Sequence, residues 1–261
     1  MRILIILLIS SVLQATELSL PFPSSEPLYE SKTVSVAEEA APAEPDIPKK
    51  AEKKKFAPMP VKKKKEEGGG RNMELAFFQL NRNETDKALE YFKKAGEEGN
   101  MEALVEIAAI LAREGKLGEL EGRIEEISDP DLKSKAMARA AGILSSLPGR
   151  EAYEKSVTYY MNVITEKNDL SPRALYELGD LMFTRKEFES AISNLVRLVR
   201  EYSDSEYAQK ANYLLGRIFD EVRDKEYARF FYREAIGSKD LGEIYIRDAK
   251  ARLKNLMPEL H

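Results

Sequence analysis

Apolar residues recur at steps of three and four residues from Arg71 almost to the end of the 261-residue chain. This is the period of an amphipathic helix, and no sustained strand alternation interrupts it. The breaks in the pattern are short and contain turn or capping residues, at 129–130, 148–149, 171–172 and 203–206. The pattern therefore predicts an all-α domain over residues 71–261.

Two of these breaks predict where helices begin. Ser171 stands directly before Pro172, as expected of an N-cap residue followed by a first-turn proline. The stretch Ser203-Asp-Ser-Glu206 matches a capping box, in which a serine and a glutamate three residues later satisfy backbone N–H groups of the first turn.

The helical pattern also repeats. Segment 174–199 aligns with 211–236, where Leu178-Gly179 matches Leu215-Gly216 at a separation of 37 residues. Small residues return at the same two positions of most copies. The five pairs of positions are Ala76 and Ala88, Ala108 and Leu120, Ala141 and Ser156, Gly179 and Ala191, and Gly216 and Ala228. Spacings of 32 to 38 residues predict five stacked helix pairs, the third with a loop about three residues longer.

Small residues at these positions have a physical reason. Where two helix axes approach to about 8–10 Å, a large side chain does not fit, so glycine and alanine permit the contact. Each pair leaves one apolar face open, and the next pair covers it, so that the stack curls into a superhelix. Residues 241–256 predict a closing helix with polar residues on its outer side.

These residues resemble the tetratricopeptide repeat family, which has Leu-Gly in the first helix of a repeat and a small residue and an aromatic residue in the second. Leu178-Gly179 with Ala191, Leu215-Gly216 with Ala228 and Tyr232, and Ala88 with Phe92 carry the resemblance, which covers about 72–236. It implies an α-solenoid that is a right-handed superhelix of about five helix pairs. The spacing is similar to that of bacterial envelope members, of the kind of the Tol–Pal-associated cell-division coordinator and the outer-membrane assembly lipoprotein.

Three departures limit the resemblance. No tryptophan occupies the family's usual position, no lipobox cysteine is present as in the assembly lipoprotein, and no coiled-coil heptads precede the repeats as in the coordinator. The resemblance still implies a groove lined by the first helix of each pair, which accepts an extended peptide or a helix. Carried onto this sequence, the groove residues are Arg113, Arg173, Tyr176, Asp180, Thr184, Lys210, Tyr213, Arg217 and Asp220. The alternative is that these are ordinary exposed polar residues.

The first fifteen residues have the pattern of a signal peptide. Arg2 supplies a positive start, Ile3–Leu13 an apolar core, and Ala15 a small residue for cleavage. This core of eleven residues, nine of them apolar, is too short to cross a hydrocarbon core, which needs about 20. We therefore expect an exported protein in the periplasm or cell envelope. The alternatives are an uncleaved anchor and a buried core segment.

Residues 16–70 predict a disordered linker, since they contain eight of the twelve prolines and no apolar period. Lysine clusters at 49–55 and 61–65 give residues 1–71 a net charge of +2, against −6 for residues 72–261. The stretch Lys49–Lys65 suggests contact with anionic lipid or cell-wall polymer, or else a solvated spacer.

The composition limits the kinds of catalytic and metal-binding site that this chain can form. The chain contains no cysteine, and its one histidine is His261 at the end, so thiolate and histidine chemistry are excluded. The glutamates at 119, 121, 125 and 126 are typical of a solvated helix face, and Gly68–Gly70 lacks the lysine of a phosphate loop. The sequence predicts no enzyme, cofactor, metal or nucleic-acid partner.

The leading hypothesis is therefore an exported scaffold that holds partner proteins, with a role in outer-membrane assembly or cell division. The second is a membrane- or wall-tethered structural protein whose lysines bind anionic polymer and whose repeats self-associate. The third is an enzyme with a helical-repeat shell.

Overall fold

The computed structural model describes residues 69–237 and 241–256, which form eleven α-helices and no strand. The first helices of the five pairs are α2 (Gly70–Asn81), α4 (Glu102–Arg113), α6 (Pro130–Leu144), α8 (Ser171–Thr184) and α10 (Glu206–Glu221). The second helices are α3 (Thr85–Glu97), α5 (Leu117–Glu125), α7 (Arg150–Thr165), α9 (Phe188–Glu201) and α11 (Lys225–Gly237), and α12 (Glu243–Leu256) follows them. This confirms the prediction of an all-α fold made of five helix pairs and a closing helix.

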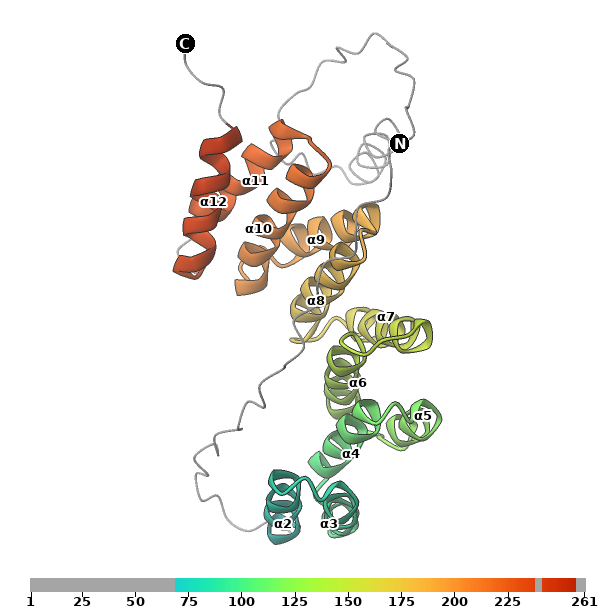
Figure 1. Cartoon of the computed structure of the whole chain (residues 1–261). Helices are drawn as coiled ribbons and strands as arrows, with labels where there is room; N and C mark the ends of the chain where they lie inside the picture. The colour runs from blue at the N-terminus through green and yellow to red at the C-terminus, as the bar shows by residue number, and fades with distance from the viewer. Residues whose placement is uncertain (1–68, 238–240, 257–261) are drawn as a thin grey trace, which may run out of the picture. The chain divides into compact units, whose positions relative to one another are not determined.

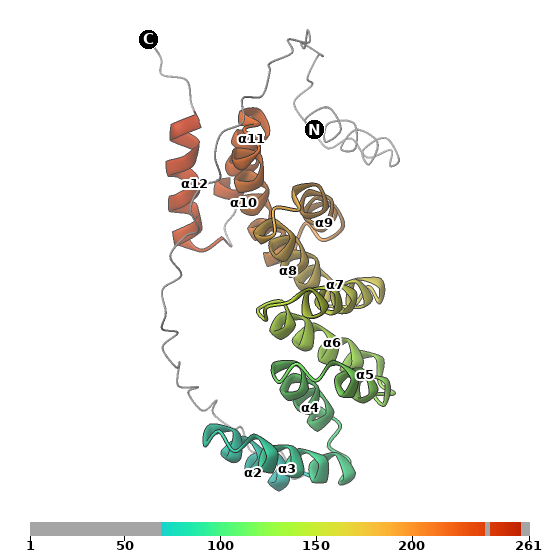
Figure 2. The same ribbon diagram turned by 45° about the vertical axis from the view of Figure 1, so that its right-hand side comes forward.

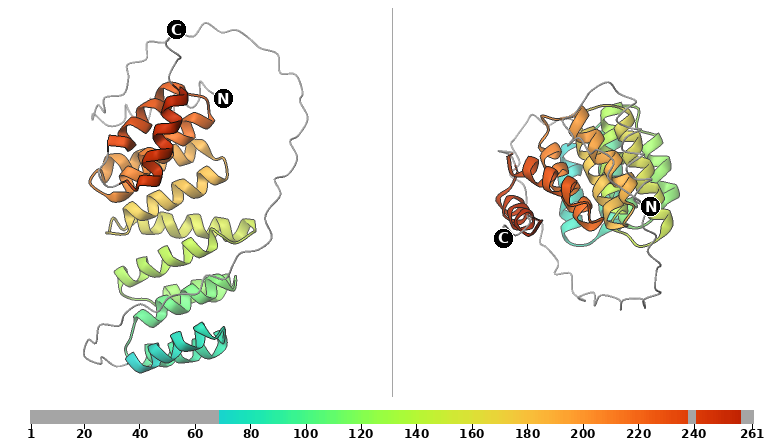
Figure 3. Two further views of the ribbon diagram at one scale, coloured as in Figure 1. Left: turned by 60° about the vertical axis from the view of Figure 1, so that its left-hand side comes forward. Right: turned by 90° about the horizontal axis from the view of Figure 1, so that it is seen from above.

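The pairs follow one another along a single direction, from α2 and α3 to α12 (Figure 3). In Figure 1, α2, α4 and α6 lie on one side of the stack, and α3, α5 and α7 lie on the other. In most junctions the second helix of one pair packs on the first helix of the next, as in α3 on α4 and α9 on α10. One junction differs, because α6 packs mainly on α4 and makes little contact with α5. Stacking of this kind makes the domain an α-solenoid.

All ten small-residue positions predicted from the repeat are buried. A Cβ atom at Gly179 would lie 2.6 Å from Leu195 Cδ2, and a Cβ at Gly216 would lie 2.6 Å from Tyr232 Cδ1. The space left by each glycine is thus filled by a large side chain of the second helix of the same pair. That side chain stands four positions after the small residue of that helix. The missing Cβ makes room for a large side chain rather than for a second small one.

The third pair departs from the others in its loop, as predicted. Its two small-residue positions are 15 residues apart in sequence instead of 12, and both are still fully buried. The second of them is Ser156, whose hydroxyl donates a hydrogen bond of 2.9 Å to the Ala141 carbonyl of the facing helix. A buried hydroxyl needs such a partner, and here the partner lies at the other small-residue position.

Four of the five turns within pairs share one backbone conformation. The residue seven positions after the first small residue has a positive φ in each, namely Asn83, Gly115, Lys186 and Arg223. Left-handed backbone costs most residues with a Cβ about 1–2 kcal/mol, so Gly115 adopts it freely and Asn83 more readily than Lys186 or Arg223. The turn geometry is therefore imposed by the packing of the helices and not by the turn residue.

The helix starts correct two details of the predicted capping. Ser171 lies inside α8 rather than before it, and its hydroxyl donates to the Val163 carbonyl at 3.1 Å, so it does not cap. The N-cap of α10 is Ser205 rather than Ser203, and its Oγ accepts a hydrogen bond from Tyr207 N at 3.2 Å. Asp129 caps α6 through a 2.9 Å bond from Leu132 N.

The expected signal peptide at 1–15 lies outside the described residues, as does nearly all of the expected linker at 16–70. In the part of the chain that the structure does describe, no helix has both the length and the apolarity to cross a membrane.

Candidate binding face

Eight of the nine predicted groove residues lie on α8 and α10, and the ninth, Arg113, is exposed at the end of α4. Because α8 packs on α10 and α10 on α12, the side chains of these three helices form one surface. We call it the tyrosine face and define it by Tyr176, Tyr207, Tyr213 and Tyr245. Two of these tyrosines, Tyr207 and Tyr245, were not among the predicted residues.

The four rings of the tyrosine face lie in two pairs. The rings of Tyr176 and Tyr207 have centroids 5.9 Å apart, and those of Tyr213 and Tyr245 are 5.1 Å apart and meet edge to face. Tyr176 and Tyr207 are partly exposed, whereas Tyr213 is only 8% exposed. Burial, and then the hydrogen bond to Asp248, raise the pKa of Tyr213 to about 12. Three of the four rings therefore offer a face to solvent.

Two predicted groove residues attach the closing helix. The Tyr213 hydroxyl donates to Asp248 Oδ2 at 2.7 Å, and Arg252 Nε donates to the same oxygen at 2.7 Å. Arg252 Nη1 also donates to Asp220 Oδ2 at 3.3 Å. The hydrogen bond from Tyr213 and the nearby Arg252 hold the pKa of Asp248 below its usual value. Tyr213 and Asp220 thus bind α12, which lies beside α10 and α11 (Figure 2).

Three other predicted residues also make contacts within the chain. Arg173 Nε donates to Glu177 Oε1 at 2.7 Å, one turn away on α8. Lys210 pairs with Glu206 at 3.4 Å and lies 4.7 Å from the centre of the Tyr207 ring. Thr184 donates its hydroxyl proton to the carbonyl of Asp180. The polar atoms of these side chains are largely used within their own helices.

Arg217 is different, because it keeps its hydrogen-bond donors free. Its guanidinium carbon lies 4.9 Å from the centre of the Phe183 ring on α8. No described residue lies within ion-pair or hydrogen-bond distance of it. A guanidinium that lies over a ring is positioned at low entropic cost while its five N–H groups stay available.

Tyr176 and Asp180 lie near Arg217 and are also unpaired. No described residue accepts a hydrogen bond from the Tyr176 hydroxyl or donates one to the Asp180 carboxylate. Desolvation raises the pKa of Asp180, although the positive charge of Arg217 acts in the opposite direction. Desolvation, and then the charge of Asp180, likewise raise the pKa of the Tyr176 hydroxyl. Together the three residues present two donors and one acceptor around partly desolvated rings.

Five residues of this surface were not predicted from the sequence, namely Phe183, Tyr207, Tyr245, Asp248 and Arg252. Phe183 follows Tyr176 by two helical turns, so helical spacing alone puts it on the same side of α8. The three residues on α12 had no comparable signal, because nothing in the repeat pattern fixes how a closing helix docks.

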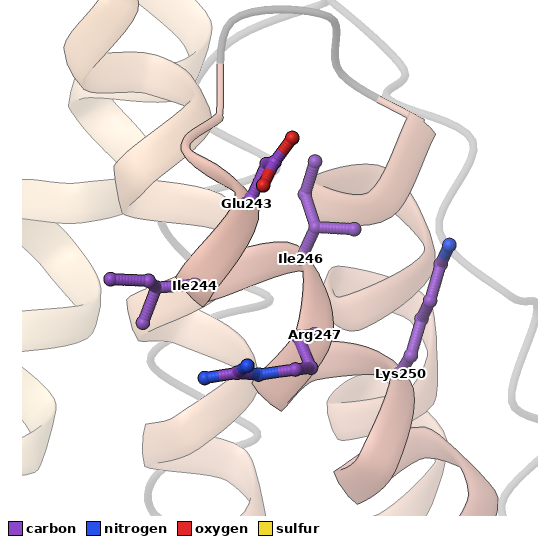
Figure 4. Close-up of a pocket in the computed structure, with 5 residues that line it drawn as sticks. All are labelled: Glu243, Ile244, Ile246, Arg247 and Lys250. Carbon is purple, nitrogen blue, oxygen red and sulfur yellow. The ribbon is translucent and has the colours of Figure 1, made fainter.

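A separate pocket lies against α12 (Figure 4). Its lining residues among those described all come from α12, and they are Glu243, Ile244, Ile246, Arg247 and Lys250. Ile244 is 73% exposed, so the outer side is not entirely polar as predicted.

Within residues 69–237 and 241–256, no group of three or more histidine, cysteine, aspartate or glutamate side chains has the geometry to hold a metal ion. A scan of the chain against protein-family models finds no matching family, and a search of curated proteins finds no matching sequence.

Proposed function

We propose that this protein is an exported, non-enzymatic scaffold of the tetratricopeptide repeat type. It binds partner proteins in the bacterial periplasm or cell envelope, in outer-membrane assembly or cell division. The observation that carries the proposal is the contrast on the tyrosine face, where most polar groups are paired and Arg217, Tyr176 and Asp180 are not. Tyrosine and arginine are the residues that most often anchor a protein partner.

Affinity capture with the full chain tests the partner-binding function. Three baits are compared: the wild type, a face variant with Tyr176→Ala and Arg217→Ala, and a control variant. The control variant carries Tyr91→Ala and Arg233→Ala on the second helices α3 and α11. We expect the wild-type and control baits to recover the same proteins from envelope extract, and the face variant to lose at least one of them. Equal recovery by all three baits rejects the tyrosine face as the docking surface.

Export is tested separately. The full chain is expressed in a bacterial host and recovered from the periplasmic fraction, where N-terminal sequencing is expected to begin at or soon after residue 16. Recovery only from the cytoplasmic fraction would refute this part of the proposal.

The lysine clusters favour a second candidate, a structural protein tethered to anionic lipid or wall polymer. Deletion of 49–65 from the full chain distinguishes the two candidates. The scaffold hypothesis expects partner capture to survive the deletion, whereas the tether hypothesis expects binding to vesicles that contain phosphatidylglycerol to be lost and no partner to depend on the tyrosine face.

A further inference from the structure

The partly exposed rings of the tyrosine face suit a flat, rigid ligand. Tyr176 and Tyr207 belong to α8 and α10, and Tyr245 on α12 continues the row beyond the buried Tyr213. Aromatic rows of this kind are how extended proline-rich segments are bound in unrelated domains, because pyrrolidine rings stack on them with little loss of conformational entropy.

The free hydrogen-bonding groups of the face suit the same ligand. The unpaired donors are the Arg217 guanidinium and the Tyr176 hydroxyl, and they need acceptors. A polyproline II segment forms no internal backbone hydrogen bonds, so all of its carbonyl oxygens can accept. Proline itself has no N–H to donate, which leaves such a segment rich in acceptors and poor in donors.

Asp180 adds one preference. Its carboxylate is exposed and has no partner among the described residues, so it is available to accept a hydrogen bond from a donor of a bound segment. The backbone N–H of a residue that is not proline can do so. The face therefore suits a segment in which prolines alternate with other residues.

A helical ligand suits the face less well. An amphipathic helix already satisfies its own backbone and requires a broad apolar surface. The large apolar side chains that stand exposed among the described residues are Phe77, Phe78, Met101, Met161, Ile244 and Tyr245. Only Tyr245 belongs to the tyrosine face, and its hydroxyl makes even this residue amphipathic.

We propose that the tyrosine face binds an extended, proline-rich segment of a partner protein, whose prolines pack on Tyr176, Tyr207 and Tyr245 and whose carbonyls accept from Arg217 and Tyr176. This inference rests on the proposed scaffold function and specifies the chemistry of the partner.

The test is a fluorescence-anisotropy titration of the full chain with a labelled peptide of Pro-Pro-Ala triplets, about twelve residues long. A Gly-Ser-Ala peptide of equal length is the control ligand, since it is flexible and uncharged. We expect the proline peptide to bind at least about tenfold more tightly than the control. A full-length variant in which the eight prolines between 21 and 60 are alanine is titrated in parallel, so that the chain's own prolines do not compete.

Substitutions on the tyrosine face test whether the proline peptide binds there. Tyr176→Ala and Arg217→Ala should each weaken it about tenfold, and Tyr176→Phe, which removes only the hydroxyl, a few-fold. Tyr91→Ala on α3 is the matched control and should leave the affinity unchanged. Circular dichroism confirms that each variant is folded, and Tyr176→Phe keeps the test valid if Tyr176→Ala unfolds.

Three results overturn the inference. They are equal affinity for the two peptides, no saturable binding, and unchanged affinity in both Tyr176→Phe and Arg217→Ala. If capture from extract still depends on the tyrosine face while the proline peptide fails to bind, the inference fails and the scaffold function stands. If neither depends on the face, the inference fails and the tyrosine face is also rejected as the docking surface.

Discussion

The α4–α6 junction and the α8–α10 junction are built from the same kind of first helix, yet they use their charges in opposite ways. Between α4 and α6, Lys135 pairs with Glu102 at 2.6 Å and Arg139 pairs with Glu106. Between α8 and α10, Arg217 lies over a phenylalanine ring, and no carboxylate of the described residues is within ion-pair distance of it.

The residues around these charges differ too. On α4 the stretch 107–112 is buried throughout and consists of alanine, isoleucine and leucine. On α8 and α10 the corresponding surface carries partly exposed tyrosines. One junction pairs its charges within the chain, and the other keeps partly exposed polar groups that are available to another molecule. A solenoid can therefore keep one fold throughout and confine binding to part of its length.

The largest expected effect concerns the glycines of these two regions. Gly216→Ala should destabilise the protein by about 2 kcal/mol, because the new Cβ would lie 2.6 Å from the buried, rigid ring of Tyr232. Gly142→Ala on α6 should stabilise it by about 0.5–1 kcal/mol, since its Cβ would meet the Tyr160 hydroxyl at an ordinary 3.6 Å. Urea unfolding of both variants measures the difference. Equal effects would show that glycine is not required for close packing in α10.

The arginines of the two junctions give the next test. Arg139→Ala removes the partner of Glu106, whose side chain is only 12% exposed, and should cost about 1–2 kcal/mol. Arg217→Ala removes only a contact with a ring and should cost about 0.5 kcal/mol or less. Both values come from the same urea titrations. A cost for Arg217→Ala as large as that for Arg139→Ala would make Arg217 a structural residue and would remove the distinction between the junctions.

The two aspartates of the tyrosine face should respond to pH in opposite directions. The pKa of Asp248 is lowered in the folded state, so its contribution to stability is present above about pH 4 and is lost as the pH falls through the folded pKa. The pKa of Asp180 is raised, so its ionisation opposes folding at neutral pH. At pH 7, Asp248→Asn should therefore destabilise the protein and Asp180→Asn should stabilise it, each by less than about 1 kcal/mol for side chains in partial contact with water.

Thermal unfolding between pH 3 and pH 7 measures both effects. Asp248→Asn should flatten the loss of stability on the acid side, and Asp180→Asn should not. Parallel pH profiles for the wild type and Asp248→Asn would mean that the bond from Tyr213 does not favour the charged carboxylate.

The sequence was sufficient for the repeat because the repeat depends on local spacing. Small residues twelve apart predict a helix pair wherever they occur, and Ala76 with Ala88 is buried just as Gly216 with Ala228 is. The prediction of what the glycines contact was less accurate, since Leu195 and Tyr232 fill the space through a three-dimensional contact that no local pattern encodes.

The candidate site could be predicted only in part, for the same reason. Positions on α8 and α10 follow from helical periodicity, so Tyr176 and Arg217 were found. Whether a groove residue is free or used within the chain depends on how neighbouring elements dock. Tyr213 and Asp220 are held by Asp248 and Arg252 of α12. Because α12 lies outside the repeat pattern, the sequence of α10 does not indicate that these two groove residues are used within the chain.

The turns of the same two regions give the last test. The α4–α5 turn has Gly115 at its left-handed position, whereas the α8–α9 and α10–α11 turns have Lys186 and Arg223 there. Lys186→Gly and Arg223→Gly should each stabilise the protein by about 0.5–1 kcal/mol, because the relief of left-handed strain exceeds the added entropy of the unfolded chain. Gly115→Ala should destabilise it by about 1 kcal/mol. Urea midpoints measure all three. A loss of stability in both glycine variants would mean that the long side chains of Lys186 and Arg223 stabilise the turns by more than their backbone strain costs.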